Sequence, residues 1–258
     1  MNAIKAIGFD LFDTLIVVKG PALRDAMERL ITSLKRQGFI FEDEEFINAY
    51  REAAREHIQA TRESGRETHN RFWISSALEK LDYFISSEDP RIAVAVEHYF
   101  QAFNDYISLI PDTLETLTQL KSRYRLGLLS NFTHPPAAYA LLKELGLDVL
   151  FEVILISGEL GFRKPHPRVF RELCERLQVL PEELIYVGDN PEDDIQGALR
   201  SGIQPVWMKY SIVHQLNFAN RLSPIPELKI DEMIPAVDNW EQFREWLQTY
   251  QKNDRTNR

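Results

Sequence analysis

The chain has 258 residues, of which 44% are hydrophobic and 27% charged, and it carries a net charge of −9. This length can bury a substantial core and suits one domain with an insertion or two modest domains. The acidic balance is not interrupted by any block rich in Lys or Arg, which argues against a nucleic-acid partner.

Membrane and disulfide roles are also disfavoured. No apolar run approaches the ~20 residues that span a bilayer, and Met1 leads almost directly into a strand-like segment rather than a signal peptide. We therefore expect a cytoplasmic protein without a membrane partner. Cys174 is the one cysteine and lies in a helical pattern, so we expect a buried thiol rather than a nucleophile.

The first part of the chain changes from a strand pattern to a helical one. Residues 4–15 are strand-like. From residue 21 to about residue 108, apolar residues recur at helical spacing and no convincing strand is present. Breaks near Gly38, Gly65 and Pro90 indicate about four helices.

Strands and helices alternate after Pro111. Such a βαβ series predicts a mostly parallel sheet, so we expect an α/β fold with a Rossmann-like, doubly wound parallel sheet as its core. The expected strands of this part are 126–129, 153–156, 184–187 and 205–208. The expected parts of the chain are a core of residues 1–16 and 109–250, an all-helical insertion at 17–108 and a disordered polar tail at 251–258.

Two of the polar motifs at expected strand ends suit a phosphate site. Asp10 directly follows the first apolar strand, at the edge of a parallel sheet that faces the ligand crevice. Ser130 and Asn131 end a second strand just before a helix, where side chains and helix-start N–H groups could hold a phosphate. Taken alone, a turn or helix cap is the simpler explanation of Ser130 and Asn131.

Two further motifs bring charge. Lys164 lies in a rigid loop just before a helix, and by itself it would be read as a solvated surface lysine. Asp189 and Asp194 follow the strand 184–187 in a dense acidic turn, although acidic residues before a helix are also common caps.

Together the motifs suggest phosphoryl-transfer chemistry. If the sheet brings Asp10, Asp189 and Asp194 to one edge, their charges repel unless a cation is present, and hard oxygen ligands suit Mg²⁺. The cation would attract a small phosphorylated metabolite, and Lys164 and Ser130 would neutralise the remaining phosphate oxygens. Attack by Asp10 on phosphorus would give an aspartyl phosphate, which water would hydrolyse.

In their order along the chain, the four motifs resemble those of the haloacid dehalogenase superfamily of hydrolases. The resemblance spans the core from Asp10 to Asp194 and indicates the subfamily with a helical cap inserted after the first core strand. It implies that Asp10 is the nucleophile and a magnesium ligand, that Ser130 contacts phosphate and that Lys164 organises charge.

The same resemblance assigns the remaining site residues. Asp189 would be a direct metal ligand, and Asp194 would act directly or through water, a role that Asp193 could share. The main-chain carbonyl of Phe12 would complete the metal set, and Thr14 matches the threonine that follows the nucleophile.

Phe12 departs from the phosphatase pattern. Phosphatases of the superfamily usually carry an aspartate at this position, which protonates the leaving group, and losing that proton donor would cost ~10²–10⁴ in rate. Asp13, one residue later, is a candidate substitute. The weaker candidates His57, His69 and His134 are more simply explained as surface or structural residues.

An aromatic residue at this position is also found in haloacid dehalogenases, but these expel halide without magnesium and do not need paired acids such as Asp189 and Asp194. We therefore favour a magnesium-dependent phosphohydrolase that is slow or selective for good leaving groups. A dehalogenase-like hydrolase and a weakly active or inactive binding protein remain open alternatives. The basic and aromatic segment 62–73 could reach a substrate from the cap, although a solvated helix face is the favoured explanation.

Overall fold

The computed structural model describes residues 3–216 and 233–256, with the side chains of 253–256 left out. Its centre is a parallel sheet with the strand order β5-β4-β1-β6-β7-β8. The predicted α/β class with a parallel sheet is therefore confirmed. The strands are β1 (Ala6–Phe9), β4 (Arg125–Ser130), β5 (Val153–Ile156), β6 (Leu184–Gly188), β7 (Gln204–Met208) and β8 (Ala236–Val237).

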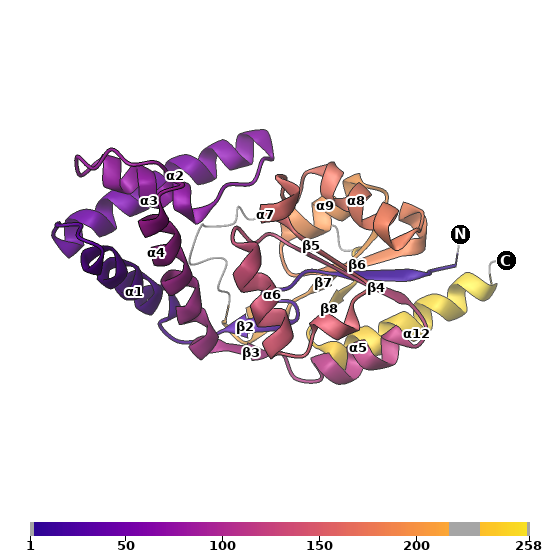
Figure 1. Ribbon diagram of the computed structural model, residues 1–258. Helices are drawn as coiled ribbons and strands as arrows, with labels where there is room; N and C mark the ends of the chain where they lie inside the picture. Colours follow the sequence, from indigo (N-terminus) through magenta and orange to yellow (C-terminus); the bar gives the residue numbers. More distant parts are fainter. Residues whose placement is uncertain (1–2, 217–232, 257–258) are drawn as a thin grey trace.

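Helices cover both faces of this sheet (Figure 1). Alternate strand residues point to opposite faces. Phe9 packs with Trp240 on one side of the sheet, and Tyr186 packs with Phe170 on the other. The helical segments of this part are α5 (Thr113–Lys121), α6 (Pro135–Glu144), η2 (Asp148–Leu150), α7 (Ser157–Leu160), α8 (Pro167–Leu177), η3 (Pro181–Glu183), η4 (Pro191–Gln196), α9 (Gly197–Arg200), α10 (Tyr210–Val213) and α12 (Trp240–Thr256).

The segment between the first two sheet strands in sequence forms the predicted helices. In α1 (Ala22–Arg36), α2 (Asp43–Ser64), α3 (Asn70–Glu79) and α4 (Pro90–Gln101), apolar faces meet in a core of their own. Helix α1 packs on α4, and α2 packs on α3. The short helix η1 (Ala102–Tyr106) then returns the chain toward the sheet. We refer to α1–α4 and their connections as the cap.

Two short strands connect the cap to the sheet domain. Strand β2 (Ile16–Val18) pairs antiparallel with β3 (Ile107–Leu109). The helical spacing predicts no strand in the stretch that ends near residue 108, and this prediction is wrong at β3. Three residues are too few for a periodic signal, and β3 is stabilised by a partner far away in sequence. The boundaries at residues 16/17 and 108/109 fall inside this ribbon and stay predictions.

The C-terminal part also differs from expectation. Helix α12 continues to Thr256, whereas the sequence analysis expects disorder from residue 251. The helix is amphipathic: Leu247 is buried in the sheet core, and the side-chain amide of Gln251 donates a hydrogen bond to the Tyr124 hydroxyl. Residues 217–232 of the expected core and residues 257–258 of the expected tail lie outside the described residues. Within the described ranges, no helix combines the length and apolar character needed to cross a membrane.

Candidate active site

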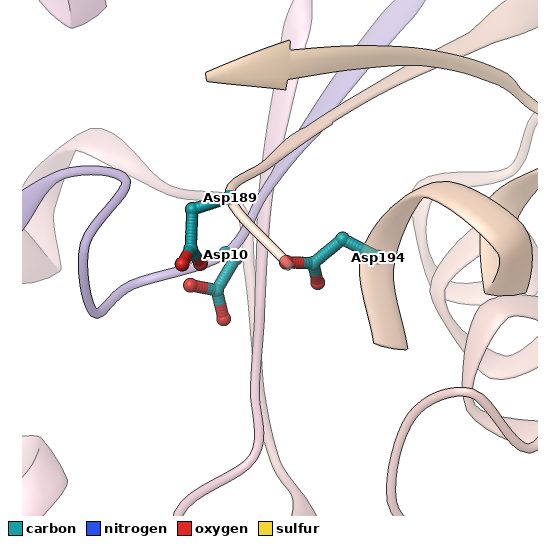
Figure 2. Close-up of side chains that lie close together, drawn as sticks. All are labelled: Asp10, Asp189 and Asp194. Carbon is teal, nitrogen blue, oxygen red and sulfur yellow. The ribbon is translucent and has the colours of Figure 1, made fainter. Parts of the chain in front are cut away.

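Three carboxylates meet at the carboxyl-terminal edge of the sheet. Asp10 follows β1 and Asp189 follows the neighbouring strand β6, and the Asp10 backbone N–H donates to the Val187 carbonyl at 2.9 Å. Asp194 lies in η4, the segment after β6. One carboxylate oxygen from each of the three residues lies within 4.8 Å of the others, and Figure 2 shows the three groups pointing into one space.

Lys164 neutralises part of this charge. Its Nζ lies 2.6 Å from Oδ1 of Asp10 and 2.6 Å from Oδ1 of Asp194, and its side chain is 2% exposed. The ammonium also donates to the Tyr186 hydroxyl at 3.0 Å, and that hydroxyl donates to the Leu129 carbonyl at 2.9 Å. All three ammonium protons therefore have partners, which fixes the position of the charge.

Burial and mutual repulsion shift the pKa values of the acidic groups upward. Burial raises the pKa of Asp10 to about 7, with Lys164 opposing the shift. Burial, together with repulsion from Asp194 and Asp10, raises the pKa of Asp189 well above its usual range. Burial disfavours the Lys164 ammonium, but its attraction to Asp10 and Asp194 raises its pKa overall. Three carboxylates and one ammonium form a site that a divalent cation would stabilise.

Asp194 is held by the turn that carries it. The Asn190 carboxamide oxygen caps η4 by accepting hydrogen bonds from its first N–H groups, and the Asn190 N–H donates to Oδ2 of Asp194 at 2.9 Å. A Cβ at Gly188 would lie 2.3 Å from Cγ of Asp194, so this close approach requires glycine. With Oδ1 of Asp194 bound to Lys164, both of its oxygens are engaged by protein groups.

Two of the residues predicted to bind phosphate, Asn131 and Thr14, make hydrogen bonds to other protein groups, whereas the Ser130 hydroxyl does not among the described residues. Asn131 ties loops together, because its amide donates to the Lys164 carbonyl at 3.0 Å and to Asp193 at 3.2 Å, and its oxygen accepts from the Lys164 N–H at 2.8 Å. The Thr14 hydroxyl donates to Oδ2 of Asp10 at 3.3 Å. The buried Ser130 Oγ has no hydrogen-bond partner among the described residues. A buried hydroxyl in this state is rare and suits an anionic ligand.

Phe12 and Asp13 occupy the turn after the predicted nucleophile. The Phe12 ring stacks on Phe132 and offers no proton. Asp13 adopts a left-handed backbone with φ 61°, and its buried carboxylate accepts a hydrogen bond from the Ser211 hydroxyl at 2.8 Å. The structure thus places the candidate substitute acid against Ser211.

The three candidate histidines lie in or against the cap. His57, in α2, contacts the Ser76 hydroxyl. Nδ1 of His134 lies 3.2 Å from Nε2 of His69, and Nε2 of His134 lies 2.8 Å from Oε1 of Glu97. His134 precedes α6 and is buried, so it contributes to the contact between the cap and the sheet domain.

Other residues of the segment 62–73 make contacts within the cap or with nearby loops. Arg71 forms an ion pair with the exposed Glu88, and the Arg66 guanidinium lies over the Phe162 ring. The favoured explanation of the segment as a solvated helix face includes Glu67 and is wrong for this residue, because its side chain is 2% exposed and meets the loop before Lys164. In the sequence, Glu67 is marked only by its place in the basic and aromatic segment 62–73.

Tyr186 and Cys174 lie in the sheet domain, outside the cap. The sequence predicts Tyr186 only as a residue of an apolar strand. Its hydrogen bond with Lys164 could not be predicted, because it depends on which face of the sheet the hydroxyl occupies. The prediction for Cys174 is confirmed: the thiol is free and buried, and burial raises its pKa to about 11.

Comparison with known proteins identifies the family. The sequence profile described as haloacid dehalogenase-like hydrolase matches residues 4–202. Glyceraldehyde 3-phosphate phosphatase from Pyrococcus furiosus is 31% identical over 218 residues, covering 84% of this chain and 85% of that protein. Phosphoserine phosphatase from Thermus thermophilus is 38% identical over 113 residues, covering 43% of this chain and 45% of that protein.

The fold comparison agrees with the family match. The crystal structure of 2-haloacid dehalogenase from Pseudomonas syringae pv. Tomato superposes with a TM-score of 0.71 at 23% identity, and the match covers 96% of this chain and 99% of that chain. At this identity the likeness concerns the fold alone. The profile match covers well over half of the sequence. The chain therefore belongs to the haloacid dehalogenase-like hydrolases.

Proposed function

We propose that this hydrolase is a magnesium-dependent phosphatase that acts on a small phosphorylated metabolite through an aspartyl phosphate at Asp10. The observation that carries the proposal is the convergence of Asp10, Asp189 and Asp194 on the buried Lys164. The named activities of the relatives from Pyrococcus furiosus and Thermus thermophilus support phosphorylated metabolites as the substrate class.

The donor set fits Mg²⁺, a hard cation that prefers oxygen ligands and keeps several waters. We assign Asp10, Asp189 and the main-chain carbonyl of Phe12 as the direct protein ligands. Asp194, whose two oxygens accept hydrogen bonds from Lys164 and Asn190, would act through water. The bound ion would neutralise charge on the phosphoryl oxygens and orient the group for in-line attack.

Asp10, Ser130 and Lys164 have separate roles in the proposed reaction. A carboxylate oxygen of Asp10 attacks phosphorus, the bond from phosphorus to the ester oxygen breaks, and the leaving group departs with the bonding electron pair. The Ser130 hydroxyl donates to a phosphoryl oxygen, which gives that orphaned group its partner. Lys164 holds Asp10 in place and balances charge as the phosphoryl group arrives. Water then attacks the aspartyl phosphate and releases inorganic phosphate.

The proton supply sets the expected substrate preference. Phe12 cannot protonate the departing oxygen, so leaving groups that are stable as anions should react fastest. Aryl phosphates should therefore be hydrolysed much faster than alkyl phosphates. Asp13 stays a candidate substitute acid, and a cytoplasmic location stays a prediction.

The test is magnesium-dependent hydrolysis of p-nitrophenyl phosphate by the full chain. Turnover should require Mg²⁺ and be abolished in Asp10→Asn. Asp43→Asn provides a matched control, because Asp43 is an exposed cap residue that pairs with Lys35. Equal rates on aryl and alkyl phosphates would show that another residue supplies the proton.

Phe12 keeps one second candidate open, because haloacid dehalogenases also carry an aromatic residue there. Chloride release from a 2-haloacid without magnesium, in the absence of phosphatase turnover, would establish dehalogenase chemistry instead. If neither reaction occurs and magnesium does not bind, the chain would be a binding protein on this scaffold.

A further inference from the structure

The connection between α2 and α3 docks directly on the loop before Lys164. The Arg163 N–H donates to the Gly65 carbonyl at 3.1 Å, and the Glu67 N–H donates to the Gly161 carbonyl at 3.1 Å. These paired bonds resemble a short antiparallel bridge between the cap and the sheet domain. The cap therefore contacts the loop that precedes Lys164 through backbone hydrogen bonds.

Close packing reinforces this contact. Gly65 ends α2 with a left-handed φ of 67°. A Cβ at this position would lie 2.6 Å from Cδ2 of His166. Both the conformation and the space therefore call for glycine, and the approach of the two segments is specific.

Glu67 adds a buried carboxylate to the contact. It accepts hydrogen bonds from the Ser157 hydroxyl, from the Thr68 N–H at 2.8 Å and from Nη1 of Arg163 at 3.3 Å. A carboxylate with 2% exposure must have such partners, because burial of an unpaired charge is costly. If the cap moved away, the Glu67 carboxylate would lose its contacts with Ser157 and Arg163.

These partners lead to both phosphate-site loops. Ser157 accepts the Phe132 N–H at 2.9 Å, and Phe132 lies two residues after Ser130. Arg163 is the residue before Lys164. The Glu67 carboxylate thus contacts Ser157 and Arg163. Ser157 holds the loop of the Ser130 hydroxyl, and Arg163 lies in the loop of the Lys164 ammonium.

We propose that Glu67 is a positioning residue that acts through Ser157 and Arg163 to hold the loops of Ser130 and Lys164 when the cap rests on the sheet domain. The inference rests on the proposed phosphatase function for its effect on turnover. Loss of Glu67 leaves every group of the catalytic site present but lowers the fraction of molecules with both loops in place. Such a loss reduces kcat more than it raises KM.

The test combines hydrogen–deuterium exchange with kinetics on the full chain in magnesium buffer. In Glu67→Gln, amide exchange at residues 130–134 and 161–166 should become about tenfold faster or more, since hydrogen bonds to a charged group are lost. For p-nitrophenyl phosphate, kcat should fall about 10- to 100-fold while KM changes less than about threefold. Glu88→Gln is the matched control, because Glu88 is an exposed cap carboxylate paired with Arg71, and it should change neither quantity.

Two further variants separate the two arms of the contact. Ser157→Ala should speed exchange at 130–134 and leave 161–166 unchanged, whereas Arg163→Gln should do the reverse. If Glu67→Gln fails to fold, Arg163→Gln still tests the inference, because the Arg163 side chain reaches Glu67, whereas Ser157→Ala also removes the acceptor of the Phe132 N–H. Unchanged exchange in both loops would overturn the inference, and so would a higher KM with unchanged kcat, which would indicate a substrate contact.

The exchange measurement keeps this inference distinct from the proposed function. A wild-type chain without phosphatase turnover would refute the phosphatase, while the exchange rates of the variants would still show whether Glu67 holds the loops.

Discussion

Phe12 stacks on Phe132 with ring centroids 5.3 Å apart and ring planes 9° apart. Phe132 in turn lies against Phe100 of the cap helix α4, with centroids 5.2 Å apart. The side chain at position 12 is thus part of an aromatic contact between the sheet domain and the cap. The side chain at position 12 therefore serves packing between the two parts of the chain.

Phe12→Asp is expected to restore a general acid. Because acid catalysis is worth ~10²–10⁴ in rate, kcat for an alkyl phosphate should rise at least about tenfold, with a smaller gain for p-nitrophenyl phosphate. Loss of the stack should lower the free energy of unfolding by about 1 kcal/mol. Steady-state kinetics on both esters measure the gain. Phe12→Leu removes the ring without adding an acid, and an equal gain in this control would contradict the explanation.

Asp13→Asn tests whether Asp13 replaces the missing acid. The Asp13 carboxylate is buried and accepts a hydrogen bond from the Ser211 hydroxyl, which holds it in the turn. Asparagine tolerates the left-handed backbone at this position. We therefore expect kcat on alkyl and aryl phosphates to stay within about threefold of wild type, whereas removal of a general acid would cost ~10²–10⁴. A loss confined to the alkyl ester would assign the proton to Asp13.

Ser130→Ala should weaken phosphate binding without weakening the fold. The Ser130 hydroxyl is buried and unpaired among the described residues, so its removal relieves a desolvation cost. The midpoint of thermal unfolding should stay level or rise, while the inhibition constant of inorganic phosphate should increase about tenfold. Ser108→Ala is the control, since Ser108 in β3 also has a buried hydroxyl that finds no partner in the part of the chain that the structure describes. If both variants bind phosphate as the wild type does, Ser130 has no role in binding.

His69 should make stability depend on pH. The His69 Nδ1 accepts the Arg71 N–H at 3.1 Å, so its proton lies on Nε2, which faces Nδ1 of His134. Burial, with repulsion from His134 and Arg71, lowers the pKa of His69 from 6.5 to about 4. The unfolded chain therefore binds more protons between these values, and stability should fall as pH falls from about 6.5 to about 4.

In His69→Gln the unfolding midpoint should fall less steeply over this range, as measured by thermal melts at a series of pH values. His57→Gln is a comparison at a second histidine. Burial also lowers the pKa of His57, which contacts Ser76 inside the cap, so this variant should reduce the slope as well. A slope in His69→Gln that equals the wild-type slope would show that His69 does not titrate as its surroundings indicate.

The sheet and its acidic edge could be predicted from the sequence for a physical reason. Parallel strands that alternate with helices must end at the same edge, so Asp10 and Asp189 had to meet once β1 and β6 were neighbours. Asp194 lies in the short turn after β6. These positions depend on local patterns and on one topological rule, whereas the place of Lys164 in the site follows only from the resemblance of its motif.

The contacts of the cap could not be predicted in this way. Glu67 meets Ser157 and Arg163, and His69 meets His134, across large separations in sequence. The periodicity of the sequence does not indicate which cap residue faces which loop. Glu67, between two helices, has the same sequence pattern as a solvated surface acid. These contacts depend on how the surface of the cap docks on the surface of the sheet domain.

The ribbon of β2 and β3 has a consequence for how such a chain can change. Ile16 lies opposite Leu109 and Val18 opposite Ile107, so the chain leaves the sheet domain and returns to it at one point. The entropy of closing a loop rises only slowly with loop length. The cap can therefore gain or lose residues in evolution at little cost to the sheet domain, while the acidic edge at Asp10 stays unchanged.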